Sequence, residues 1–228
     1  MIKHRKGAKA AKEEPAKEVG RTIRKYRDSC QSDFWQAIFE KEASYLLKRL
    51  KGCRSVLSVG CGPAVIEKEL QAKGFVITGL DVSKEALEGA PDSVRTVVGS
   101  AERMEFESNS FDAVIYVASL QFIGNYEKAI KEAARVLKPE GKLIVMLLNP
   151  ASGFFKAKTK EADSYVNKIK HSRLAPIEES IRKNFAHVRA SYCLGVSGKS
   201  VFESRNPDLA TIYLVEGTKP QVDVTMVT

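Results

Sequence analysis

Residues 55–81 read SVLSVGCGPAVIEKELQAKGFVITGLD, and this stretch predicts the centre of the fold. Its first apolar run, residues 56–59, is typical of a strand buried on both faces. The run stops at residues 60–62, GCG, where two glycines permit a tight turn and leave the backbone open to a ligand. A helical pattern and a second apolar run follow, and that run ends on Asp81. We therefore expect a strand, a glycine loop, a helix and a strand, with a carboxylate placed to accept hydrogen bonds from a ribose.

The same unit occurs in dinucleotide-binding proteins and in S-adenosylmethionine (SAM) methyltransferases, and the spacing of the loop separates them. The dinucleotide pattern G-x-G-x-x-G requires a third glycine at position 65, where this chain has Val65. The difference disfavours a pyrophosphate at the start of the helix and, with it, an NAD-dependent dehydrogenase. In the methyltransferase alternative, the loop lies against the methionine part of SAM and Asp81 holds the ribose.

Length and charge indicate one domain with a basic N-terminal region. The chain has 228 residues and a net charge of +9, and residues 1–30 carry six of these nine charges. We expect residues 1–20 to be a disordered basic tail, for which an RNA-binding or membrane-binding arm is the alternative. The first 30 residues lack the apolar segment of a secretory signal, and the longest aliphatic run, Leu143–Leu148, is too short to span a bilayer. We therefore predict a cytoplasmic protein without a membrane span.

Cysteines and histidines show no metal-ligand spacing. The four cysteines, Cys30, Cys53, Cys61 and Cys193, form no C-x-x-C pair, and the three histidines are scattered. A disulfide framework is unusual in a chain of this length. We expect free thiols and no metal site.

Strands and helices alternate along the middle of the chain. Strands are predicted at residues 94–98, 111–117 and 143–148, and a helix before Pro139 and Gly141 separates the last two. Such alternation predicts an α/β fold with a parallel, doubly wound sheet. Ligands bind to such sheets outside the carboxyl ends of the strands.

Two segments are expected to cover that edge of the sheet. An amphipathic helix should begin at Asp33, with this residue as its cap, and end at Gly52. Residues 149–175 break the alternation and combine aromatic residues with lysines, which suits an excursion over the ligand edge.

The remaining chain completes one domain, which we expect to span residues 21–217. Two last strands are predicted at residues 188–194 and 211–215, with a polar connection between them, and residues 218–228 read as a C-terminal tail.

Four motifs stand in order along the chain: VLSVGCGPA, TGLDVS, GSAERMEFESNSFDAVIYVASLQFI and EAARVLKPEGKLIV. Together they resemble the class I SAM-dependent methyltransferases, in the small-molecule branch related to the ubiquinone and menaquinone methyltransferases. The resemblance runs from about Tyr26 to Gly217. It implies a Rossmann-like sheet of seven strands in the order 3-2-1-4-5-7-6, with strand 7 antiparallel.

The resemblance also implies SAM as the cofactor and a set of residues around it. The methionine part would lie against the glycine loop, the ribose on Asp81, and the adenine between Val82 and the polar loop after the third strand. The sulfonium would face the residues after the fourth strand, and Tyr26 matches an aromatic residue that covers the cofactor. The residues so implied are Tyr26, Gly60, Cys61, Gly62, Asp81, Val82, Ser100, Ala101, Glu102, Ala118 and Ser119.

Three positions depart from the usual pattern of this family. Ser58 replaces a common acid, Ala64 replaces the third loop glycine, and Ser100 replaces the acid that receives the adenine amino group. Exchanging a charged acceptor for a hydroxyl weakens a hydrogen bond from ~1.5–3 kcal/mol toward ~0.5–1.5 kcal/mol. Two such losses reduce affinity by about tenfold to a few hundredfold, which SAM binding should survive. A non-catalytic SAM-binding or nucleoside-binding protein therefore remains the alternative.

The expected reaction is transfer of a methyl group to a small-molecule acceptor by in-line displacement. Because the leaving group is good, the protein mainly has to align the reactants and exclude water, and no catalytic residue is required. Tyr165 and His171 are candidates for a base if the acceptor must lose a proton. An RNA methyltransferase is less favoured, because VASLQFI stands where many base-amino methylases carry an Asn-Pro-Pro-Tyr type of sequence. A nucleic-acid partner is accordingly not expected.

Overall fold

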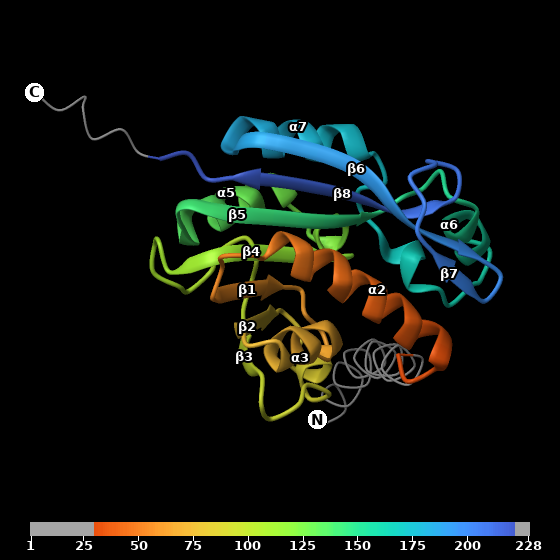
Figure 1. The fold of residues 1–228 in the computed structure, drawn as a ribbon, viewed down its shortest axis with the longest axis horizontal. Coiled ribbons are helices and arrows are strands. Elements are labelled where there is room, and N and C mark those ends of the chain that lie inside the picture. Colours follow the sequence, from red (N-terminus) through yellow and green to blue (C-terminus); the bar gives the residue numbers. More distant parts are fainter. Residues whose placement is uncertain (1–29, 222–228) are drawn as a thin grey trace, which may run out of the picture.

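The computed structural model describes residues 30–221, so the predicted basic tail and Tyr26 lie outside the described residues. An eight-stranded sheet forms the middle layer, in the order β3-β2-β1-β4-β5-β8-β6-β7. Helices cover both of its faces (Figure 1). The molecule is therefore an α/β structure with three layers.

The first five strands are parallel, as predicted, and β8 enters antiparallel between β5 and β6. The strands are β1 (Ser55–Val59), β2 (Val76–Asp81), β3 (Arg95–Val98), β4 (Phe111–Val117), β5 (Leu137–Leu148), β6 (Ala186–Ser197), β7 (Ser200–Phe202) and β8 (Ala210–Thr218).

Seven strands were predicted, but the sheet has eight, and the additional strand is β7. Residues 200–202 lie in the expected polar connection, but they pair antiparallel with the end of β6. Gly198, with a φ of +60°, lies in the turn that makes this hairpin possible. The ring of Phe202 packs so closely on Gly195 that a Cβ atom there would lie 2.4 Å from it. Without β7, the strand order is the predicted one, with β8 in the place of strand 7.

The helices divide between the two faces of the sheet. Residues of α2 and α3 pack in one apolar cluster with one side of the strands, and residues of α5 and α7 pack in a second cluster on the other side. The helices are α2 (Asp33–Arg49), α3 (Val65–Ala72), α4 (Lys84–Leu87), α5 (Tyr126–Val136), α6 (Gly153–Lys158) and α7 (Leu174–Asn184), with 3₁₀ turns η1 (Leu120–Phe122) and η2 (Tyr165–Lys168).

Successive residues of the central strands belong alternately to these two clusters. Val56 and Ile115 belong to the α2 side, whereas Leu57 and Val114 belong to the α5 side, and all four are fully buried. This confirms that β1 is buried on both faces, as its continuous apolar run indicated, and β4 is buried in the same way.

The two predicted boundaries of the helix before β1 differ slightly in the structure. Ser32 occupies the cap position of α2 without a side-chain capping bond, and Asp33 is the first helical residue, where its charge suits the positive end of the helix. The helix ends at Arg49, and Gly52 lies in the turn beyond it. The helix α5 ends at Val136, before Pro139 and Gly141 as predicted, and these two residues lie in an irregular first part of β5, where the pairing with β4 shifts register.

Candidate functional site

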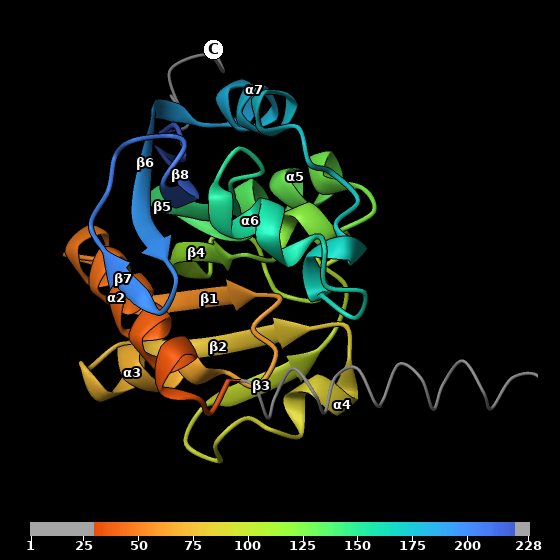
Figure 2. The same cartoon turned by 90° about the vertical axis from the view of Figure 1, so that its right-hand side faces the viewer.

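A cavity of about 540 Å³ lies at the carboxyl ends of the parallel strands. Figure 2 shows the arrowheads of β1, β2 and β4 pointing toward the same edge of the sheet. The volume falls within the range of ~300–1,000 Å³ that small-molecule sites occupy. The loops after β1, β3 and β4 line one part of the cavity, and α2, α6 and η2 line another. The ligand edge predicted from the alternation of strands and helices is thus the edge that holds the cavity.

The glycine loop after β1 is tied to the end of β2. The Gly60 N–H donates a hydrogen bond to the Leu80 carbonyl (2.7 Å). Gly60 has a φ of +72°, and a Cβ atom there would lie 2.5 Å from the Cβ of Ser119. Ser119 in turn donates through its hydroxyl to the Val59 carbonyl (2.6 Å). The β1 and β4 loops therefore touch, and only glycine fits at their contact.

Asp81 joins the end of β2 to this loop. Its Oδ2 accepts a hydrogen bond from the Gly62 N–H (2.9 Å), and its Oδ1 accepts one from the Ser83 N–H (2.9 Å). A carboxylate has about four acceptor sites, so these two bonds leave acceptor capacity at a side chain that lines the cavity. The spacing from the glycines to Asp81 therefore predicted a real contact between the two.

The cavity brings together every predicted cofactor-binding residue that the structure describes. Ser100 accepts a hydrogen bond through its hydroxyl from the Glu102 N–H (3.2 Å), and Glu102 accepts one from the Asn125 N–H (2.9 Å). Val82 is 76% exposed and lies at the rim. The predicted residues in the lining are Gly60, Cys61, Gly62, Asp81, Val82, Ser100, Ala101, Glu102, Ala118 and Ser119. Their contacts with SAM remain a prediction.

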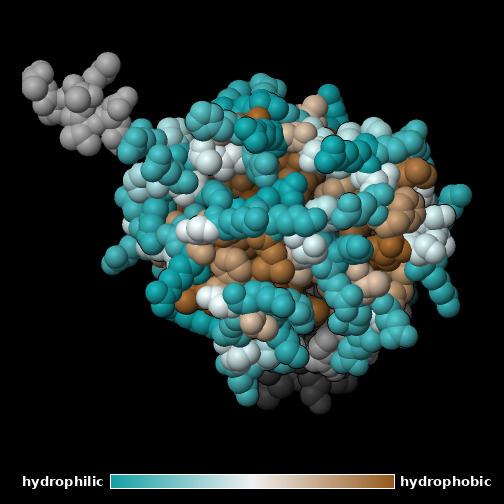
Figure 3. All heavy atoms as spheres, viewed as in Figure 1, coloured by the Kyte–Doolittle hydropathy of each residue, from teal (hydrophilic) through white to brown (hydrophobic). Residues whose placement is uncertain are grey.

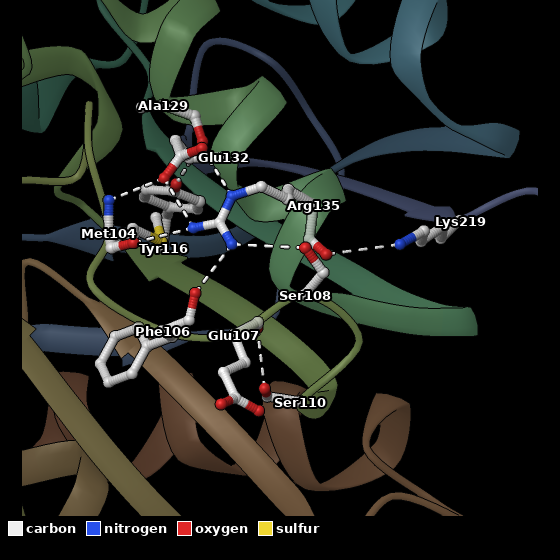
Figure 4. A network of polar contacts seen from close by, with 10 residues as sticks. All are labelled: Met104, Phe106, Glu107, Ser108, Ser110, Tyr116, Ala129, Glu132, Arg135 and Lys219. Carbon is white, nitrogen blue, oxygen red and sulfur yellow. Dashed lines mark hydrogen bonds and ion pairs between the residues drawn. The ribbon is translucent and has the colours of Figure 1, made fainter.

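A polar network holds the segment after β3 against α5 (Figure 4). Arg135 donates to the carbonyls of Met104 (2.8 Å) and Phe106 (2.7 Å) and pairs with Glu132 (2.8 Å). Glu132 also accepts the Met104 N–H (2.7 Å). This network fixes the chain just beyond Ser100, Ala101 and Glu102, although none of its members lines the cavity.

The two candidate bases occupy different places. Tyr165 lines the cavity, and burial, together with the charge of Glu42, raises the pKa of its hydroxyl, which makes it a poor base at neutral pH. His171 is not part of the cavity lining. Its Nε2 lies 3.0 Å from the carbonyl oxygens of Ile123 and Gly124. His171 therefore supports the loop after η1 from outside the cavity.

Two buried glutamates in the lining escaped the sequence analysis. Glu42 on α2 is 5% exposed and Glu67 on α3 is 3% exposed. Burial raises the pKa of Glu42 to about 8, and the charge of Glu67 adds to the rise. Burial also raises the pKa of Glu67 to about 7, although Glu67 accepts a hydrogen bond from the Ser58 hydroxyl (2.5 Å). The signal for Glu42 was its position within the apolar stripe of the helix, four residues after Ile38 and four before Leu46.

Aromatic rings form a wall at the side of the cavity next to Glu42. The Trp35 ring lies 6.0 Å from that of Phe39, 6.3 Å from that of Phe154 and 6.0 Å from that of Tyr165. Phe122 stacks on Tyr165 at 6.3 Å. We call these five residues the aromatic wall. It joins α2 to the segment after β5, and apolar residues also reach the surface over α6 and β7 (Figure 3).

All four cysteines are free, and no cluster suited to a metal ion occurs among residues 30–221. Burial raises the pKa of Cys61 in the glycine loop and of Cys193 in β6, so these thiols stay protonated and are poor nucleophiles. Within the same residues, no helix is long and apolar enough to cross a membrane.

Comparison with known proteins matches the central part of the chain to one family. Residues 57–145 match the profile of a family described as a methyltransferase domain. This segment is therefore similar to a methyltransferase domain. The matched residues run from β1 to β5 and include the glycine loop, Asp81 and the loops after β3 and β4. The predicted resemblance to this family is confirmed.

Two curated relatives of the matched region are named as methyltransferases of small molecules. The chain is 38% identical over 97 residues to a demethylmenaquinone methyltransferase of Corynebacterium glutamicum, covering 42% of each chain. It is 33% identical over 98 residues to a sterol 4-C-methyltransferase of Caenorhabditis elegans, covering 39% of this chain and 29% of the relative. The chain thus spans less than half the length of these two curated relatives.

A solved structure matches over nearly its whole length. It is a SAM-dependent methyltransferase of Thermotoga maritima, described as a possible histamine N-methyltransferase. The TM-score is 0.74 at 22% identity, and the match covers 88% of this chain and 97% of that one. At this identity the likeness establishes the fold alone.

Proposed function

We propose that this protein is a SAM-dependent methyltransferase that transfers a methyl group to a small-molecule acceptor by in-line displacement. One observation carries the proposal. Asp81 is bonded to the glycine loop within an open cavity, and its carboxylate keeps acceptor capacity on the cavity side. A carboxylate of this kind can bind the two hydroxyls of a ribose.

The residues present fit SAM on two further grounds. A Cβ atom built on Gly62 would meet nothing within 4 Å, so the backbone of the loop is open to a ligand. The lining also contains four carboxyl groups, those of Glu42, Glu67, Asp81 and Glu102, against the lysines of positions 168 and 170. Glu42 and Glu67, whose raised pKa values keep them largely protonated, can ionise beside a cofactor that carries a positive sulfonium.

Different residues of the site would bind different parts of the cofactor and the acceptor. Asp81 and the glycine loop would hold the ribose and the methionine part, and the loop after β3 would hold the adenine. When bound, SAM supplies an activated methyl group. The aromatic wall excludes water from the space beyond the loop and offers an apolar surface to the acceptor.

At two of the positions that differ from the usual family pattern, the structure supplies a feature that the usual residue would provide. Ser58 replaces an acid, but its hydroxyl bonds the Glu67 carboxyl, so α3 brings a carboxyl group beside this position. Ala64 keeps a left-handed conformation, with a φ of +55°, at the position where a glycine is usual. Both observations support cofactor binding. The cavity also continues to the aromatic wall, which disfavours a purely non-catalytic protein.

Calorimetric titration with SAM tests the proposal. We expect Asp81→Ala to weaken SAM binding by at least tenfold, because the ribose acceptor is lost and the glycine loop loses its anchor. Asp92→Ala is the matched control, since Asp92 is an exposed aspartate in the turn just before β3. Absence of SAM binding at millimolar concentration, or equal binding by the wild type and Asp81→Ala, would contradict the proposal.

A further inference from the structure

We propose that the methyl acceptor carries a protonated amine, which Glu42 binds at the aromatic wall and from which Glu42 takes the proton before methyl transfer. The inference rests on the proposed function and names the substrate class of the same site. It depends on three observations: Glu42 lies in the cavity lining, aromatic rings surround it, and its carboxyl group has no bonding partner among residues 30–221.

Glu42 is a buried carboxyl group without a partner in the described structure. It lines the cavity at 5% exposure, and within residues 30–221 it makes no hydrogen bond or ion pair. Removing a carboxyl group from water without a partner is costly. A cationic ligand in the cavity would supply the missing partner.

The surroundings of Glu42 also favour a cation. Trp35 and Phe39 lie on the same face of α2, seven and three residues before Glu42. Tyr165 from η2 lies within 6.0 Å of the Trp35 ring, measured between centroids. Aromatic faces attract ammonium groups, most strongly where water is excluded. A carboxyl group beside such rings is suited to an amine attached to an apolar body.

The two buried glutamates belong to different parts of the cavity. Glu67 bonds to Ser58 on β1. Burial raises the pKa of Cys61 in the glycine loop, and the charge of Glu67 adds to the rise. Burial also raises the pKa of Tyr165 on η2 and of Cys193 on β6, and there the charge of Glu42 adds to the rise. Glu67 therefore lies at the cofactor end, whereas Glu42 lies at the acceptor end.

The two lysines in the lining do not act as the cationic partner of Glu42. Lys168 and Lys170 are not buried, and the Lys170 ammonium lies beside Gly124, next to the Glu102 carboxylate. Lys170 is therefore at the rim beside the loop after β3, and Lys168 is exposed. No Lys or Arg side chain of the described lining lies beside Glu42 in the interior.

The proposed step conserves atoms and charge. The acceptor ammonium gives a proton to the Glu42 carboxylate, and the neutral nitrogen then uses its lone pair to form a bond to the methyl carbon. The carbon–sulfur bond breaks, and its electron pair stays on sulfur. The products are a methylated ammonium and S-adenosylhomocysteine. Burial raises the pKa of Glu42 to about 8, which brings it closer to that of an alkylamine and makes the proton transfer easier.

The test compares two probes of the same shape, phenethylamine and 2-phenylethanol, by calorimetry on the full chain with S-adenosylhomocysteine present. We expect the wild type to bind the amine at least tenfold more tightly than the alcohol. Glu42→Gln keeps the size and a hydrogen-bonding group but removes the charge, so the preference should vanish. Glu40→Gln, an exposed change on the same helix, should retain it. Wild type that binds the amine no better than the alcohol, or Glu42→Gln that keeps the preference, overturns the inference.

A second measurement needs only the wild type. Glu67 from α3, Tyr165 from η2 and Cys193 from β6 are the titratable groups around Glu42. Amine binding at pH 7 should release protons as Glu42 ionises, which titrations in buffers of different ionisation enthalpy detect, whereas the alcohol should release none. Amine binding without proton release counts against the inference.

A SAM titration of the same samples separates the two proposals. If the wild type fails to bind SAM, the proposed function fails. If SAM binds equally to the wild type and to Glu42→Gln while the amine preference is absent, only the amine inference fails.

Discussion

Gly60 occupies the tightest contact in the candidate site. A methyl group there would both force a left-handed conformation on alanine and approach Ser119 to 2.5 Å. We expect Gly60→Ala to destabilise the fold by about 2–4 kcal/mol and to abolish SAM binding, because the loops after β1 and β4 must separate. Urea denaturation measures the first effect and calorimetry the second.

Gly62→Ala is the control for this prediction. Gly62 also has a positive φ, of +52°, but a Cβ atom there meets no atom within 4 Å. The substitution should therefore cost only the conformational strain of about 1–2 kcal/mol. Equal losses for the two variants would show that the contact with Ser119 does not matter.

The buried glutamates predict how stability depends on pH. The pKa of Glu42 is raised from 4.5 to about 8 in the folded protein. Between these values the folded state holds a proton that the unfolded state has lost, so the contribution of Glu42 to stability is greatest below about pH 4.5 and is lost as the pH rises through 8. Thermal unfolding from pH 5 to 9 should show a smaller fall for Glu42→Gln than for the wild type. The variant should still lose some stability as the pH rises, because Glu67, whose pKa is raised to about 7, remains in place. Identical profiles for Glu42→Gln and wild type would contradict the assigned pKa.

Sequence reasoning found the residues whose roles are local and missed those whose roles depend on packing. Asp81 and the glycine loop are encoded by the spacing of one contiguous stretch, so their contact was predictable. Glu42 and Glu67 are buried because α2 packs on α3, and no local pattern specifies that arrangement. A glutamate on a helix ordinarily indicates a solvated face, and only the apolar neighbours of Glu42 at helical spacing suggested otherwise.

At the level of elements, Arg135 couples α5 to the loop that would hold the adenine. We expect Arg135→Ala to cost about 1–3 kcal/mol, because the carbonyls of Met104 and Phe106 lose their donor. SAM affinity should fall as well, although Arg135 does not line the cavity. Arg103→Ala is the control, since Arg103 is exposed and approaches only Glu105, at 4.0 Å. A loss of stability without any change in SAM affinity would show that the loop holds its position alone.

The elements that sequence reasoning placed correctly are those with long, periodic patterns. The buried runs of β1, β4 and β5 and the apolar stripes of α2 and α5 were sufficient to predict them. The hairpin of β6 and β7 was missed because its second strand has only three residues and depends on a turn at Gly198 and on Phe202 packing over Gly195. Short strands of this kind follow from tertiary contacts rather than from periodicity.

Across the whole molecule, the cavity is built from segments far apart in the sequence. The break in alternation predicted that residues 149–175 cover the ligand edge, and Phe154 and Tyr165 from this segment do line the cavity. The sequence could not show that they pack on Trp35 of α2, because that contact joins two segments more than 100 residues apart.

Phe154 tests this connection. Phe154→Ala removes the ring contacts with Phe34 and Trp35, and a loss of 1–2 kcal/mol in local stability should raise trypsin cleavage at the neighbouring lysines by about 5–30-fold. Mass spectrometry of the fragments would locate the cuts at positions 156–160. Phe155→Ala is the matched control, because within residues 30–221 the Phe155 ring pairs with no other aromatic ring. Similar cleavage of both variants would mean that the aromatic wall does not hold the segment in place.

Trp35 is the only tryptophan in the chain, and it lies in the cavity lining between Phe39, Phe154 and Tyr165. Its ultraviolet emission therefore comes from a single, known location, and any molecule that enters that space alters the polarity and quenching around one indole. The protein thus carries its own optical probe of occupancy, with which candidate acceptors can be screened without labelling and before any turnover assay exists.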